Sequence, residues 1–295
     1  MTPLHDWENL FRNEAFVNNY KTGEKITGKF AKALLEQSGL IANPKLNPDK
    51  PLVVLDNACG TGVVSSILHH ELDEKVKQSW KLTCGDISEG MLEYTRRRMS
   101  SEAWLNAEIK QVDAQETKLP TGHYSHVITS FAYMALPRAL TALDESWRIL
   151  QPGGTLAFST WIQPGWVPVI KRAIETHPDN LPWPTTEEFL TTLGNGEWNS
   201  PRWIESQLRH RGLEDIHAMV ITKSISLSVA ELVEMTMIMI PMVAKHFWTE
   251  DQREKSSGNV RPALEKYLED TYGKEGQVPM EWTAILSTAR KPVHI

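Results

Sequence analysis

Between Leu52 and Thr160 the sequence alternates short, continuous apolar runs with segments whose apolar residues recur at helical spacing. Such short runs are typical of strands buried on both faces, and strands joined through helices pair in parallel. The alternation therefore predicts a doubly wound, mostly parallel α/β sheet. The predicted strands are Leu52–Leu55, Trp80–Cys84, Ala107–Val112, His126–Ser130 and Thr155–Thr160, and the predicted helices between them are Val63–Leu72, Glu89–Met99 and Arg138–Leu150.

The segments on either side of this core predict additional helices and two more strands, which makes seven strands in all. Residues 1–50 contain two or three amphipathic helices and a polar linker, and we expect them to form a lid over a cofactor-binding core at 51–160. Residues 161–295 begin with a stretch rich in Trp and Pro, and we assign them to a substrate cap and the last strands. The elements predicted there are helix Ile204–Arg211, strand Ile216–Ile221, a helical insertion over Val229–Tyr272 and strand Trp282–Ala289.

Charge and composition exclude several classes of protein. With 31 Lys plus Arg against 37 Asp plus Glu, the formal charge is −6, so the chain lacks the basic excess of a general nucleic-acid binder. The most apolar stretch, Met235–Ala244, is interrupted by Pro241 and is too short to span a membrane. Cys59 and Cys84 are the only cysteines, and no signal peptide is evident. We expect a cytoplasmic protein without nucleic-acid, membrane or obligate protein partners.

The most informative motif is the small-residue loop Asp56–Gly62, between the first predicted strand and the helix that follows it. Small residues let the backbone approach a ligand closely. The loop departs from the nicotinamide-dinucleotide fingerprint, because Ser65 stands where the third glycine would be. Asp56 would also lie beside a pyrophosphate, whereas a carboxylate there suits a cationic ligand. S-adenosylmethionine, with its ammonium and sulfonium groups, meets that requirement.

Two further acidic residues follow the next strands and complete a candidate cofactor site. Asp86 comes directly after the second strand, where its carboxylate can accept hydrogen bonds from both hydroxyls of a ribose. Asp113 follows the third strand and is placed to bind an adenine amino group. Ile87 and Met91 are expected to pack on the faces of the adenine.

These residues resemble the class I S-adenosylmethionine-dependent methyltransferases. The resemblance rests on the glycine-rich loop, on Asp86, on Val112–Ala114 and on Arg148–Leu156, in which a helix stops at Pro-Gly-Gly before the fifth strand. Ala58 departs from the family, which usually has a glycine there. The resemblance adds the following residues to the cofactor site: Asn57, Ala58, Cys59, Gly60, Ala114 and Ser130.

A closer resemblance is to the fungal thiol methyltransferases that act on epidithiodiketopiperazines such as gliotoxin. It is carried by Tyr20–Gly28, Val54–Gly60, Trp80–Asp86 and Phe247–Glu250. It implies S-methylation of a reduced dithiol metabolite, with a bis(methylthio) product and S-adenosylhomocysteine as the second product. It also implies that Tyr20 and Thr27 close over the methionyl carboxylate, although packing on a shared helix face explains those two residues equally well.

The acceptor and the catalytic groups are less constrained by the sequence. We assign Phe131, Tyr133, Trp161 and Trp166 to an apolar substrate pocket, because they lie at or just beyond the ends of the fourth and fifth strands. No residue stands out as a catalytic base and no metal-binding cluster is evident, so we expect catalysis by positioning. The run Arg96–Arg98 is interpreted as a solvated helix face. O- or N-methylation of another small metabolite, and a regulatory protein that binds the cofactor without turnover, remain alternatives.

Overall fold

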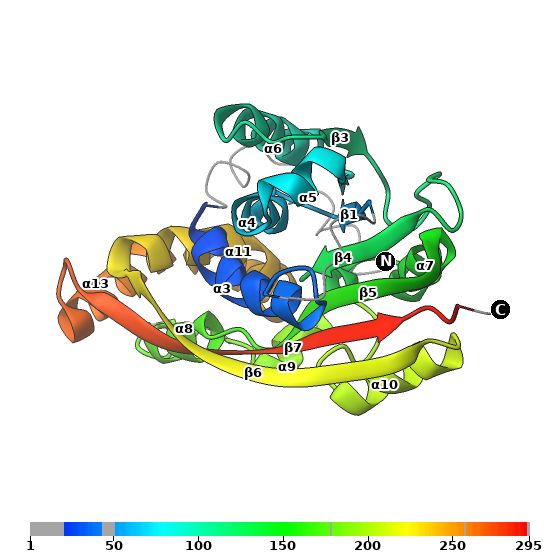
Figure 1. Cartoon of the computed structure of the whole chain (residues 1–295). Helices are drawn as coiled ribbons and strands as arrows, with labels where there is room; N and C mark the ends of the chain where they lie inside the picture. Colours follow the sequence, from blue (N-terminus) through cyan, green and yellow to red (C-terminus); the bar gives the residue numbers. More distant parts are fainter. Residues whose placement is uncertain (1–20, 43–50, 178, 257, 294–295) are drawn as a thin grey trace.

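The computed structural model describes residues 21–42, 51–177, 179–256 and 258–293, and it is built on one sheet of seven strands (Figure 1). The strand order is β3-β2-β1-β4-β5-β7-β6, with β7 antiparallel to both of its neighbours and β1 to β5 parallel. This confirms the doubly wound, mostly parallel seven-stranded fold. The strands are β1 (Val53–Asn57), β2 (Lys81–Asp86), β3 (Ala107–Gln111), β4 (Tyr124–Ser130), β5 (Leu150–Gln163), β6 (Glu214–Ser228) and β7 (Gln277–Arg290).

Helices cover both faces of the sheet. Because crossover connections between parallel strands are right-handed, the helices joining β1 to β2 and β2 to β3 lie on one face, and the helix joining β4 to β5 lies on the other. The first described helix packs against α4 and against β5 and β7. The helices are α3 (Lys21–Gln37), α4 (Val63–Glu71), α5 (Glu74–Ser79), α6 (Glu89–Ser101), the 3₁₀ turn η1 (Tyr133–Ala135), α7 (Ala139–Ile149), α8 (Trp166–Ile174), α9 (Thr186–Thr191), α10 (Pro201–His210), α11 (Val229–Phe247), α12 (Glu250–Ser256) and α13 (Val260–Tyr272).

The central strands are inaccessible to solvent on both faces, as their continuous apolar runs predict. Val54, Leu55, Val127, Ile128 and Leu156 are all fully buried. β1 begins one residue later than predicted and continues through two polar residues at its carboxyl end. The strand therefore delivers polar side chains directly to the edge of the sheet where a ligand binds.

The stretch beyond Trp161 is more helical than its sequence pattern predicts. The Trp and Pro residues interrupt the helical spacing of apolar residues, so the sequence pattern does not reveal the two helices α8 and α9. Pro168 is tolerated because it lies in the first turn of α8, where backbone N–H groups have no partner within the helix. Trp166 and Val167 face the core from the same turn.

The last two strands are longer than predicted and form a ribbon that carries the helical insertion at one end (Figure 1). In β6 the alternation continues beyond Ile221, since Ile225 and Leu227 are buried while Ser224 and Ser226 are exposed. The three helices α11 to α13 fill the connection between β6 and β7. None of the described helices is long and apolar enough to cross a membrane.

The connection between β3 and β4 is fixed by a carboxylate on α7. Glu145 accepts hydrogen bonds from the backbone N–H and the hydroxyl of Thr117, at 3.0 and 2.8 Å. Arg148 donates to both carboxylate oxygens of Glu145 and to the carbonyl of Leu119. The hydrogen bonds from Arg148 and Thr117 lower the pKa of Glu145 to about 2.

We expect Glu145→Gln to destabilise the fold at neutral pH by about 1–2 kcal/mol. This is less than the free energy that corresponds to the full pKa shift, because solvent partly screens the pair. The folded pKa lies below the usual value of 4.5, so this stabilisation is present above pH 4.5 and is lost as the pH falls towards 2. Urea unfolding at pH 7 and pH 3 measures the effect. The difference between wild type and variant should shrink at pH 3, and an undiminished difference would refute the linkage.

Candidate active site

A cleft of about 810 Å³, counting its open mouth, lies at the carboxyl ends of β1, β2, β3 and β4. This is the edge at which the connections from β1 and β4 turn to opposite faces of the sheet, where doubly wound sheets bind ligands. The lining residues are Ala58, Gly60, Asp86, Ile87, Met91, Val112, Asp113, Ala114, Gln115, Ser130, Phe131, Ala132, Ala135, Leu136 and Pro137.

The loop between β1 and α4 forms one wall of the cleft and turns through three left-handed residues. Ala58, Gly60 and Gly62 have φ values of +55°, +55° and +76°. A Cβ atom on Gly62 would lie 2.9 Å from Thr95, so that position requires glycine. A Cβ atom on Gly60 would meet no atom within 4 Å, which leaves open space beside the backbone. Ala58 adopts the left-handed conformation in spite of its Cβ, at a cost of about 1 kcal/mol.

Asp86 connects this loop to the second strand. One carboxylate oxygen accepts from the backbone N–H of Gly60 at 2.8 Å, and the other accepts from the N–H of Ser88 at 2.9 Å. Burial raises the pKa of the Asp86 carboxyl, and the backbone hydrogen bonds act against this rise. A carboxylate has about four acceptor sites, so Asp86 can also accept from hydroxyl groups of a ligand in the cleft.

The far end of the cleft is formed by the segment that follows β3. Asp113 accepts from the backbone N–H and the side-chain amide of Gln115, at 2.8 and 3.1 Å. Gln115 in turn accepts from the N–H of Arg138 at 2.7 Å, so the cleft wall is tied to the start of α7. Gln115 is absent from the predicted site residues, although its position two residues after Asp113 points to this edge of the sheet. Ile87 and Met91 add apolar surface beside it.

Asp56 is placed differently from the expectation that it faces the cofactor. Its carboxylate is 1% exposed, does not line the cleft, and accepts from the N–H and hydroxyl of Ser65 at 3.2 and 2.7 Å. Burial raises the pKa of Asp56 to about 7. The residue holds the first turn of α4 against β1, because its side chain leaves the strand towards that helix.

The other predicted residues of the loop and lid lie behind the cleft or outside the described residues. Asn57 is 1% exposed, and neither polar atom of its side chain has a hydrogen-bond partner among the described residues. Cys59 is buried, which raises the pKa of its thiol and makes it a poor nucleophile. Thr27 does not line the cleft, and its hydroxyl donates to the carbonyl of Gly23 within α3. Tyr20 falls outside the described residues.

The four aromatic residues assigned to the substrate separate into two groups. Phe131 lines the cleft in a left-handed conformation, with φ +55°, and its ring stacks on Trp161 at 3.9 Å. Phe30 of α3 meets both rings edge-on. Tyr133 and Trp166 do not line this cleft, contrary to expectation. The hydroxyl of Tyr133 pairs with Ser146 in the core, and Trp166 packs against Trp183 and Phe189.

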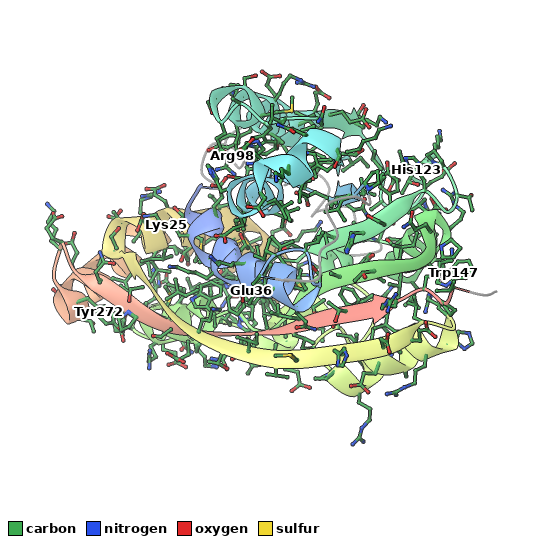
Figure 2. All side chains as sticks on the ribbon, viewed as in Figure 1. Lys25, Glu36, Arg98, His123, Trp147 and Tyr272 are labelled. Carbon is green, nitrogen blue, oxygen red and sulfur yellow. The ribbon has the colours of Figure 1, made fainter. Side chains whose placement is uncertain are left out.

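Arg98 does not belong to a solvated helix face, which corrects the interpretation of that basic run. Its side chain is 17% exposed and extends from α6 towards α3, as Figure 2 shows. It donates to the carbonyl of Thr61 in the glycine-rich loop at 2.9 Å and to Glu24 of α3 at 2.6 Å. The helical pattern could not reveal this role, because it depends on what lies opposite α6. Arg98 thus fixes the loop and α3 together.

The donor set of the cleft fits S-adenosylmethionine. Asp86 retains acceptor sites for ribose hydroxyls, Gly60 leaves room against the backbone, and apolar side chains offer surface to an adenine. No Lys or Arg is among the described residues that line it, which disfavours a ligand with a pyrophosphate. Within the described ranges no three His, Cys, Asp or Glu side chains are grouped so that they could hold a metal ion.

Comparisons with known proteins agree with this geometry. Residues 54–154 match a family described as a methyltransferase domain. The chain is 42% identical to the methyltransferase tpcH of Aspergillus fumigatus, over 97% of this chain and 99% of that protein. It is 40% identical to the acetylaranotin bis-thiomethyltransferase of Aspergillus terreus, over 96% of this chain and 97% of that protein.

Solved structures show the same fold at low sequence identity. A phosphoethanolamine N-methyltransferase of Haemonchus contortus, in complex with S-adenosylmethionine, matches with a TM-score of 0.55 and 15% identity over 96% of this chain and 60% of that chain. A methyltransferase structure from Bacillus halodurans matches with a TM-score of 0.53 and 14% identity over 89% of this chain and 98% of that chain. These matches bear on the fold alone.

We expect Asp86→Ala to weaken binding of S-adenosylhomocysteine by at least tenfold, because two charge-assisted hydrogen bonds of about 1.5–3 kcal/mol each are lost. Calorimetric titration measures this, with circular dichroism to verify that the variant is folded. Asp144→Ala, which removes an exposed carboxylate of α7 paired with Arg211, is the matched control and should bind as wild type does. A dissociation constant for Asp86→Ala within threefold of wild type would contradict the assignment.

Proposed function

Because this chain belongs to the S-adenosylmethionine-dependent methyltransferases, we propose that it methylates both thiols of a small reduced dithiol metabolite of the epidithiodiketopiperazine type. The observation that carries the proposal is its 40% identity, over nearly the whole of both chains, to a bis-thiomethyltransferase. The acceptor would be a gliotoxin-like dithiol, and the product its bis(methylthio) derivative.

The chemistry of the cleft supports a thiol acceptor. Asp86 and Asp113 are the only titratable side chains that line it among the described residues, and both already accept hydrogen bonds from the protein. No His, Lys or Tyr of the described ranges is placed there to remove a proton from an alcohol. A thiol needs no such base, since a few per cent is ionised at neutral pH and the thiolate is strongly nucleophilic.

The cleft residues then act by binding and by excluding water. S-adenosylmethionine, when bound, supplies an electrophilic methyl group. Asp86 and the backbone at Gly60 orient the ribose end of the cleft, and Ile87 and Met91 bound its apolar end. Phe30, Phe131 and Trp161 form an apolar aromatic wall next to it. Holding the reactants in line in a dry site lowers the barrier to such a transfer without a catalytic base.

A reducing compartment fits this proposal, because a disulfide form of the acceptor has no thiolate to react. Both cysteines of the chain are free and buried. We therefore propose that the enzyme works in the cytoplasm on the reduced acceptor, after a separate reduction step.

We expect a reduced epidithiodiketopiperazine to gain two methyl groups, whereas its disulfide form and a phenol or amine of similar size gain none. The rate should rise with pH towards the pKa of the acceptor thiol, because no tuned base assists. Mass spectrometry of parallel incubations follows the additions. Equal methylation of the phenol or amine would overturn the thiol proposal and leave the methyltransferase assignment intact.

We also expect full activity in excess chelator, since the described residues around the cleft include no group of three His, Cys, Asp or Glu side chains that could hold a metal ion. Initial rates with and without a chelator of divalent cations provide the measurement. A loss of activity that magnesium restores would point to a metal-assisted acceptor such as a catechol instead.

A further inference from the structure

A second cavity, of about 580 Å³ counting its open mouth, lies next to the cofactor cleft. Trp161 lines it, and the same ring stacks on Phe131, which lines the cofactor cleft. Within η1 the two cavities also share neighbours, since Met134 faces the second cavity while Ala135 faces the cleft. The two spaces therefore adjoin across one wall, made by the stacked rings and η1.

The outer wall of the second cavity is formed by α9 and the loop 193–199, and this loop is closely fitted to η1. A Cβ atom on Gly194 would lie 2.7 Å from the carbonyl oxygen of Met134, so only glycine permits the approach. Trp198 is 4% exposed and stacks on Tyr133 at 5.6 Å, which anchors the loop in the core. The cavity is thus a built feature of the fold.

The segment that contains this wall is strongly acidic. Between Arg172 and Arg202 the sequence has five acidic residues and no Lys or Arg. Glu187 and Glu197 line the cavity, and neither forms an ion pair with a described residue. In contrast, Glu175 pairs with Lys171 and Glu188 caps α9.

Unpaired carboxylates at the rim of a cavity create a local negative potential, which attracts cations and repels anions. We propose that the second cavity binds the body of the acceptor, and that Glu187 and Glu197 restrict it to uncharged or cationic thiols. Thiols that bear carboxylates, such as glutathione, are thereby disfavoured. This inference rests on the proposed thiol acceptor and names the charge class of that acceptor.

Two acceptors that differ mainly in charge test whether Glu187 and Glu197 disfavour anionic thiols. They are 4-(mercaptomethyl)benzyl alcohol, which is neutral, and 4-(mercaptomethyl)benzoate, which is anionic. In both, a methylene group separates the thiol from the ring, so the two thiols have similar pKa values. At low salt we expect kcat/KM for the neutral thiol to exceed that for the anionic one by about tenfold, and the ratio to fall as salt screens the field. In Glu187→Gln/Glu197→Gln the ratio should fall to about twofold, through a gain on the anionic thiol only. Glu175→Gln, in the same segment but outside the cavity, should retain the wild-type ratio.

A variant that fills the second cavity tests, independently of charge, whether the acceptor binds there. Thr191→Trp places a large ring on an exposed position of α9 that lines the second cavity. We expect KM for the neutral thiol to rise at least about tenfold, while the dissociation constant of S-adenosylhomocysteine and the Tm stay at wild-type values. An unchanged KM, or a wild-type enzyme that takes both thiols equally, would overturn the inference. If neither thiol is methylated but a phenol or amine is, the proposed function itself has failed.

Discussion

The site depends on one carboxylate, that of Asp86, which is bound to two backbone N–H groups. It joins the glycine-rich loop after β1 to the start of α6 after β2, and so fixes the relative positions of the two strand ends that frame the cofactor cleft. Because the side chain is 8% exposed, solvent competes weakly for these hydrogen bonds. Arg98 supports the same loop from behind through the carbonyl of Thr61. The cleft is therefore preorganised by the chain itself.

The sequence predicts well those residues whose positions follow from sheet geometry alone. Residues directly after parallel strands gather at one edge, so the order of strands and helices is enough to place Asp86, Asp113 and Phe131 in one cleft. Side-chain direction and tertiary partners are not encoded in that way. Asp56 points to Ser65, and Tyr133 turns into the core, because of contacts that strand and helix patterns do not reveal.

The two sides of the site differ in character, and this difference links the structure to the reaction. The cofactor side offers fixed backbone groups and carboxylates that already accept hydrogen bonds. The proposed acceptor side offers stacked rings and two glutamates that form no ion pair with another described residue. Among the described residues, no His, Lys or Tyr lines the cleft or the second cavity to remove a proton from a weakly acidic acceptor. A thiol that ionises without a catalytic base, on a molecule with no other negative charge, is therefore compatible with both the cleft and the second cavity.

A structure of the enzyme with S-adenosylhomocysteine and a bis(methylthio) product would show directly whether the cleft and the second cavity bind cofactor and acceptor. We expect the ribose hydroxyls on Asp86 and one methylthio sulfur at the wall formed by Phe131 and Trp161, with the rest of the product in the second cavity. A cofactor bound away from Asp86, or a product bound on the far side of the sheet, would contradict this expectation.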